Sequence, residues 1–127
     1  MEFKNLIVYQ KALSNFQEIE SRILILKELD RNLKDQLRRA SISIILNIAE
    51  GSSRFSMADR KNFLVISRGS AFECSAILDI IAFKLNISFS GIQNILEEIS
   101  KMLYKMITTL RESEEYTMKK KNVFERR

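Results

Sequence analysis

The sequence predicts an all-α, single-domain protein folded as an antiparallel up-down-up-down four-helix bundle. The 127-residue chain has no proline and only three glycines, the two residue types that most disfavour helix interiors. Four stretches repeat apolar residues at steps of three and four, which is the spacing of one helix face. The connections between these stretches are short, so we expect sequential helices to be antiparallel neighbours.

The first helix is expected over residues 5–28. Its inward stripe consists of Tyr9, Ala12, Leu13, Phe16, Ile19, Ile23 and Leu26. Asp30 or Asn32 then offers a side-chain N-cap for a second helix over residues 31–54, whose last turn Gly51 weakens.

The second helix is apolar on two sides. One stripe contains Leu33, Leu37, Ala40, Ile44 and Ile48, and a second apolar group lies opposite it. The members of that second group are Ile42, Ile45, Leu46 and Ala49. Because such a helix must be buried on both sides, we expect one side to face the domain's own core and Ile42, Ile45 and Leu46 to face another subunit.

The third helix is expected over residues 57–86, after a capping box at Ser56 and Asp59. Its seam is Phe63, Ser67, Ser70, Cys74, Ile77 and Ile81, and small residues around Gly69 should let a neighbouring helix approach closely. A second capping box at Ser90 and Gln93 opens a fourth helix over residues 91–115. The chain thus divides into a bundle over residues 1–116 and a basic C-terminal tail over residues 117–127.

Composition narrows the class of protein. With 46% hydrophobic residues the chain is globular, and its formal net charge is +5. The single cysteine, Cys74, forms no internal disulfide, which fits a reducing cytoplasm. The N-terminus is too polar for a signal peptide, and no apolar run approaches the roughly 20 residues that span a bilayer. We therefore expect a soluble cytoplasmic protein with no membrane partner.

The absence of histidine argues against enzymatic chemistry. Histidine is the commonest general base and a ligand in the usual zinc and di-iron motifs, and this chain has none. The three glycines are scattered, so no glycine-rich phosphate loop is present. We expect no catalytic residue, no metal site and no cofactor.

A file of polar residues runs between the two apolar sides of the second helix: Arg39, Ser43, Asn47, Glu50 and Arg54. Arg38 and Arg39 could contact phosphates with two guanidinium groups. Alternatively, Arg39 pairs with a carboxylate such as Glu50 or Glu73, inside one bundle or between bundles, and this structural role is favoured. Asn47 and Glu50 lie among isoleucines, so we expect them to fix helix register or a subunit contact.

Basic residues gather in two places. The tail carries Lys119, Lys120, Lys121, Arg126 and Arg127, and the junction of helices two and three carries Arg54, Arg60, Lys61 and Arg68. Together with Arg38 these residues form a candidate nucleic-acid surface, because cations neutralise phosphates without reading sequence. The alternative interpretation is a solvated, frayed terminus and an ordinary charged helix start.

Residues 36–44, 47–51 and Arg54 resemble the signature of the four-helix-bundle family of 23S ribosomal RNA intervening-sequence proteins. Residues 3–12 resemble that family's start, and residues 63–70 with Glu73 resemble its third helix. Two departures are Ile45, where the family often has proline, and Tyr9, where it often has tryptophan. Without that proline the second helix should be straighter.

The resemblance implies a cyclic homopentamer, often encoded inside an insertion of the large-subunit ribosomal RNA gene. It also implies likeness in fold to the accessory variability determinant (Avd) of diversity-generating retroelements, a basic pentamer that works with a reverse transcriptase and its RNA. Two hypotheses follow for this chain. The first is an RNA-binding accessory protein, and the second is a scaffold that binds another protein, for example a reverse transcriptase.

Overall fold

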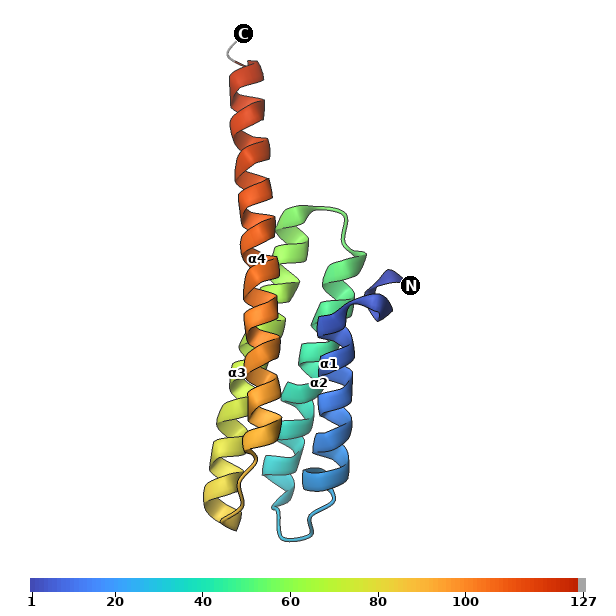
Figure 1. The fold of residues 1–127 in the computed structure, drawn as a ribbon, viewed down its shortest axis with the longest axis vertical. Helices are drawn as coiled ribbons and strands as arrows, with labels where there is room; N and C mark the ends of the chain where they lie inside the picture. Colours follow the sequence, from blue (N-terminus) through green and yellow to red (C-terminus); the bar gives the residue numbers. More distant parts are fainter. Residues whose placement is uncertain (126–127) are drawn as a thin grey trace.

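The computed structural model describes residues 1–125 as a bundle of four helices in which successive helices run in opposite directions (Figure 1). The helices are α1 (Ile7–Ile19), α2 (Arg31–Ser53), α3 (Met57–Leu85) and α4 (Ser90–Glu125). A short 3-10 turn, Glu2–Asn5, precedes α1, and a π-helical turn, Glu20–Leu24, follows it. Within residues 1–125 there is no strand. The predicted all-α four-helix fold is confirmed.

The first helix is shorter than predicted. The extended backbone of Leu6 separates α1 from the N-terminal turn, and the α-helix ends at Ile19 instead of continuing to residue 28. The π-helical turn that follows is wider than an α-helical turn. Ile23 and Leu24, although adjacent, are both buried there. The wider turn therefore closes the lower end of the core before the chain enters α2.

Side-chain caps fix the starts of α2 and α3, as predicted. Asp30 Oδ1 accepts a 2.9 Å hydrogen bond from the backbone N–H of Leu33, so Asp30 and not Asn32 is the cap of α2. Ser56 Oγ accepts a 3.1 Å hydrogen bond from the N–H of Asp59 at the start of α3. That helix ends at Asn86, whose φ of 52° is the left-handed conformation typical of a helix C-terminus.

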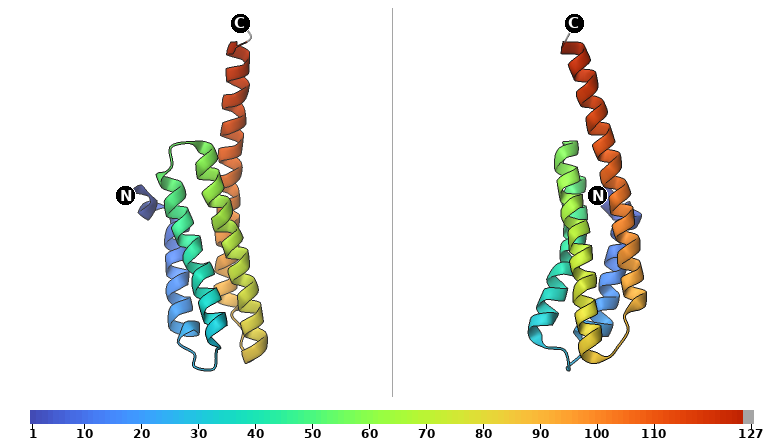
Figure 2. Two further views of the ribbon diagram at one scale, coloured as in Figure 1. Left: turned by 180° about the vertical axis from the view of Figure 1, so that it is seen from behind. Right: turned by 90° about the vertical axis from the view of Figure 1, so that its left-hand side faces the viewer.

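The predicted capping box at the start of α4 is wrong. Ser90 is already helical, and the side-chain Nε2 of Gln93 donates to the backbone O of Ser75 at 3.1 Å and to Asp79 Oδ1 at 2.8 Å. Gln93 thus ties α4 to α3 instead of closing its own first turn. At its other end α4 continues to Glu125, well past residue 115, and projects beyond the other helices in every view (Figures 1 and 2).

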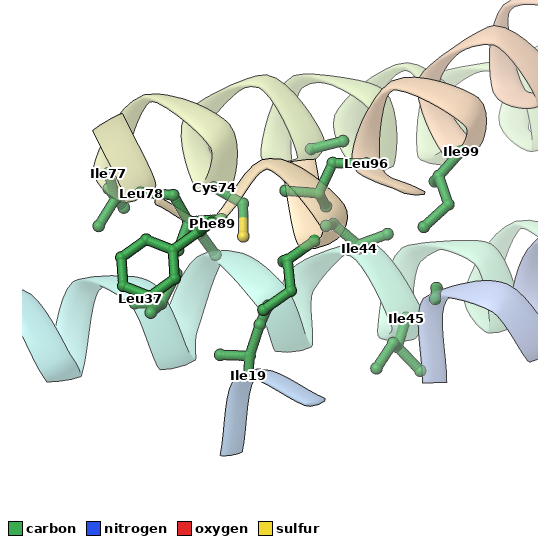
Figure 3. Packing of buried hydrophobic residues seen from close by; sticks show 14 of the residues in the cluster. Ile19, Leu37, Ile44, Ile45, Cys74, Ile77, Leu78, Phe89, Leu96 and Ile99 are labelled. Atoms are coloured by element: carbon green, nitrogen blue, oxygen red, sulfur yellow. The ribbon is translucent and has the colours of Figure 1, made fainter. Parts of the chain in front are cut away.

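The core lies along the bundle axis and receives aliphatic side chains from every helix (Figure 3). All five residues of the predicted α2 stripe are buried: Leu33, Leu37, Ala40, Ile44 and Ile48. No helix within residues 1–125 has both the length and the apolar character needed to cross a membrane.

Helices α2 and α3 approach each other through small residues. Ser67 Oγ donates to Ile44 O at 2.8 Å, and the hydroxyls of Ser43 and Ser70 lie 2.7 Å apart. A Cβ placed on Gly51 would lie 3.2 Å from Phe63 Cβ, so this glycine permits the contact. A Cβ on Gly69 would meet nothing within 4 Å, so Gly69 plays no part in the close approach that we expected of it.

Candidate self-assembly and nucleic-acid surfaces

Helix α3 carries large apolar side chains on the face opposite its buried seam. We call this surface the α3 outer face, and its members are Val65, Ile66, Phe72, Ile80 and Phe83. All are exposed, and Phe83 is 88% exposed. Steps of seven, eight and three residues from Val65 reach Phe72, Ile80 and Phe83, which keeps them on one side of the helix. Only the inner seam of this helix was predicted from the sequence; its second apolar face was not.

The α3 outer face is also acidic. Between Val65 and Phe83 the exposed charged residues are two carboxylates, Glu73 and Asp79, and the one cation of this stretch, Arg68, is half-buried on the Phe72 ring. Asp79 accepts the Gln93 hydrogen bond, whereas Glu73 makes no ion pair among residues 1–125. This surface combines apolar bulk with one uncompensated negative charge.

Helix α2 presents an open groove on its own outer side, which we call the α2 groove. Its lining residues are Asp35, Arg38, Arg39, Ile42, Ser43, Leu46 and Asn47. Leu46 is 60% exposed and Ile42 is half-buried, in keeping with their expected position on an outward face. Ile45 is only 8% exposed and belongs to the core of its own bundle, so its assignment to a subunit interface was wrong. Helix α1 packs on α2, and Figure 3 shows Ile45 beside it.

The polar file of α2 is paired differently from expectation. Glu50 pairs with Arg54, one turn later, and Asn47 Nδ2 donates to Ser43 O at 2.8 Å. Arg39 is exposed and, among residues 1–125, makes no ion pair with Glu50, Glu73 or any other carboxylate. An Arg39 pair inside one chain is therefore ruled out in this structure, and a pair between chains stays a prediction.

The basic residues predicted to form one nucleic-acid surface lie at opposite ends of the bundle. Arg38 pairs with Asp35 at 3.4 Å and reaches Glu20 at 4.0 Å, near the end of the bundle where α1 leads into α2. At the opposite end, Arg60 Nε donates to Arg54 O at 2.6 Å, and Lys61 pairs with Glu114 at 3.1 Å. These cations hold helix ends together within the chain.

Two arginines lie on aromatic rings. The Arg54 guanidinium lies 4.7 Å from the centre of the Phe63 ring. The Arg68 guanidinium lies 4.7 Å from the Phe72 ring centre and 5.3 Å from that of Tyr104, which bridges α3 to α4. Such contacts favour a cation over the ring face. Arg68 thus belongs to the α3–α4 seam and not to a patch with Arg54.

The predicted tail is helical as far as the structure describes it. Lys119, Lys120 and Lys121 lie on the last turns of α4, all exposed, and Tyr116, Val123 and Phe124 are exposed beside them. Lys121 lies 3.9 Å from Glu125, and Lys120 lies 6.0 Å from the Tyr116 ring centre. Arg126 and Arg127 lie outside the described residues.

The candidate reactive groups are the Cys74 thiol and any cluster of side chains that could hold a metal ion. Burial raises the pKa of the Cys74 thiol to about 12, so Cys74 is a core residue and not a nucleophile. Among residues 1–125, no three His, Cys, Asp or Glu side chains gather in a way that could hold a metal ion.

Comparison with known proteins identifies the family. The family model described as "23S rRNA-intervening sequence protein" matches residues 4–109. The chain belongs to this family. A crystal structure of a protein of unknown function from the S23 ribosomal protein family of Bacteroides thetaiotaomicron is similar, with a TM-score of 0.72 and 26% identity. The match covers 80% of this chain and 98% of that one. A search of curated proteins finds no match.

The matched segment of this intervening-sequence protein contains both outer surfaces and excludes the last turns of α4. The α2 groove and the α3 outer face lie within residues 4–109, whereas Lys119, Lys120 and Lys121 lie beyond them. The projecting end of α4 thus lies outside the matched segment, and any function of its lysines needs its own support.

Proposed function

We propose that this intervening-sequence protein is a non-enzymatic, homo-oligomeric accessory protein that associates with RNA. The pentamer implied by the resemblance is the assembly that we assign to it. The observation that carries the RNA role is the projecting end of α4, which places Lys119, Lys120 and Lys121 beyond the bundle, exposed on a regular helix.

The projecting helix end has the composition of a nucleic-acid contact. Three adjacent lysines offer charge for phosphates. Tyr116 and Phe124 offer exposed rings on which unpaired bases stack. In a cyclic oligomer every copy would present this helix end on the same side of the ring, so several weak contacts would add their effects through high local concentration.

The test is binding of a fluorescein-labelled RNA hairpin across a series of salt concentrations. We expect affinity to fall steeply with added salt. Changing Lys119, Lys120 and Lys121 together to glutamine should reduce the slope of log affinity against log salt by about 2 for each subunit engaged, because each phosphate contact contributes about 0.7 to 0.9.

A matched control removes the same charge from the other end of the bundle. Lys27, Arg31 and Lys34 make no ion pair within residues 1–125, and changing all three to glutamine should leave the slope unchanged. Equal losses of RNA affinity in the two triple variants would show that binding depends on net charge and not on the lysines at the end of α4. Binding that ignores salt, or no binding by the unmodified chain, would refute the RNA role.

The exposed apolar side chains of α3 also favour the second hypothesis, a scaffold for another protein such as a reverse transcriptase. Five large apolar side chains on one helix face are typical of a protein contact. This hypothesis requires a stable complex with that protein after nuclease treatment. Loss of the complex when RNA is removed would rule it out.

A further inference from the structure

We propose that copies of this chain assemble head to tail, with the α3 outer face of one copy lying in the α2 groove of the next. In this arrangement Glu73 of one copy pairs with Arg39 of its neighbour. The inference rests on the self-assembly proposed above and adds to it the two surfaces and the ion pair that joins them.

The two surfaces differ in shape and charge, which favours a head-to-tail contact over a two-fold one. The α3 outer face is a helix ridge with projecting rings, apolar and acidic. The α2 groove is hollow, has Leu46 and Ile42 along it, and carries Arg39. Each surface is complementary to the other and not to itself. A contact between two different surfaces repeats from copy to copy and generates a ring when the rotation between copies closes.

The size of the α3 outer face fits a subunit contact. Its residues extend over about 27 Å of helix at 1.5 Å per residue. Large side chains have areas of up to about 150–250 Å², so the exposed parts of these five sum to on the order of 500 Å². That is at the upper limit of what single-chain proteins leave exposed, and it is a large part of the roughly 800 Å² that each partner buries in a standard interface.

The charges make a second copy the fitting partner. Glu73 follows Phe72 and lies two helical turns from Ile66 and from Ile80 on the same side of α3, so covering this face would bury a carboxylate. A buried carboxylate is costly unless a cation pairs with it, and a guanidinium does so with two parallel hydrogen bonds. Arg39 has no carboxylate partner within residues 1–125 of its own chain and lines the apolar α2 groove. The chain therefore carries both halves of the required pair, one on α2 and one on α3.

The experiment reverses each charge and measures mass by size-exclusion chromatography with light scattering at micromolar concentration. Arg39→Glu alone and Glu73→Arg alone should each raise the dissociation constant at least tenfold. The double variant Arg39→Glu/Glu73→Arg should recover the ring, because every contact then joins a reversed pair. An equimolar mixture of the two single variants should recover association between unlike chains, but not a closed ring of five, because two kinds of chain cannot alternate around an odd number of positions. A pair formed within one chain would not be restored by mixing.

Two controls keep the test interpretable. Lys105→Glu makes the same charge change on an exposed α4 residue without an ion pair among residues 1–125, and it should assemble like the unmodified chain. Circular dichroism melts of all variants report whether the bundle stays folded. Phe83→Ser, at an 88% exposed position, should weaken assembly without changing the fold.

The outcomes separate this inference from the proposed function. An unmodified chain that remains single at every concentration would refute self-assembly itself. An oligomer that tolerates both charge reversals and Phe83→Ser, or reversals that the double variant fails to rescue, would overturn the Arg39–Glu73 contact alone.

Discussion

The two longest helices, α3 and α4, place their apolar residues differently. Between residues 90 and 110, α4 buries one stripe, and Tyr104 is its only exposed large apolar residue. In contrast, α3 is apolar on its inner seam and again on its outer face. The packing of a single bundle accounts for the apolar residues of this part of α4 but for only one of the two apolar faces of α3. The α3 outer face, which the packing of one bundle leaves exposed, is therefore the surface on which we expect a partner to bind.

The largest expected effect comes from shortening two adjacent side chains of α3, one on its buried face and one on its exposed face. Ile81 is 0% exposed and Ile80 is 49% exposed. Ile81→Ala should lower the free energy of unfolding by about 2–5 kcal/mol, as buried large-to-small changes do. Ile80→Ala should change it by less than about 1 kcal/mol while weakening assembly. Urea denaturation below the assembly concentration measures the first quantity, and light scattering measures the second.

Equal destabilisation by the two alanine variants would remove the distinction between the faces. It would place Ile80 inside the bundle and remove it from the α3 outer face. A loss of assembly in Ile81→Ala alone, at matched fraction folded, would place the contact on some other surface.

The fold was predictable because the signals of a helix, its apolar repeat and its capping residues, are local in the sequence. Ser56 was predicted as a cap from residue type and spacing, and Asp30 as one of two candidates with Asn32; the structure confirms Ser56 and selects Asp30. The α2 stripe was recognised from its period alone. These features depend on neighbours in sequence, which the sequence displays directly.

The outer surfaces were only partly predictable because exposure depends on which helix covers which side. The sequence predicted burial on both sides of α2, yet α1 covers Ile45, while Leu46 is exposed and Ile42 and Ala49 are half-buried. For α3 the second stripe was present in the sequence, at Val65, Phe72 and Phe83. The long-range partner of Asn15 had no local signal: its amide donates to Ile92 O at 3.5 Å across the bundle.

A smaller effect sharpens the same contrast with two glycines. A Cβ on Gly51 would crowd Phe63 Cβ at 3.2 Å, whereas a Cβ on Gly69 meets open space. Gly51→Ala should therefore cost about 1–3 kcal/mol of unfolding free energy through overpacking. Gly69→Ala should add about 0.4–1 kcal/mol by reducing the freedom of the unfolded chain. Thermal and urea unfolding of the two variants measure both signs.

Opposite signs for the two glycine variants would confirm that α3 meets α2 only on its inner side. Destabilisation by Gly69→Ala at dilutions where the chain is single would contradict the open space around it. If Gly69→Ala is stabilising when single yet weakens assembly, the α3 outer face approaches its partner closely at this point.

The smallest effect concerns the end of the bundle where α2 begins and α3 ends. The pKa of Asp30 lies below its ordinary value of 3.8, first because the Leu33 N–H donates to it and then because Lys84 does. A lowered folded-state pKa stabilises the fold above the unfolded value, and this contribution is lost as pH falls through the folded pKa. Asp30→Asn keeps an oxygen for the cap but has no titrating charge, so its melting temperature should lie slightly below that of the unmodified chain near neutral pH. The two melting curves should converge as pH falls below 3.8. A gap that stays constant from neutral to acid pH would show that Asp30 acts by shape alone, and that its charge does not link α2 to Lys84.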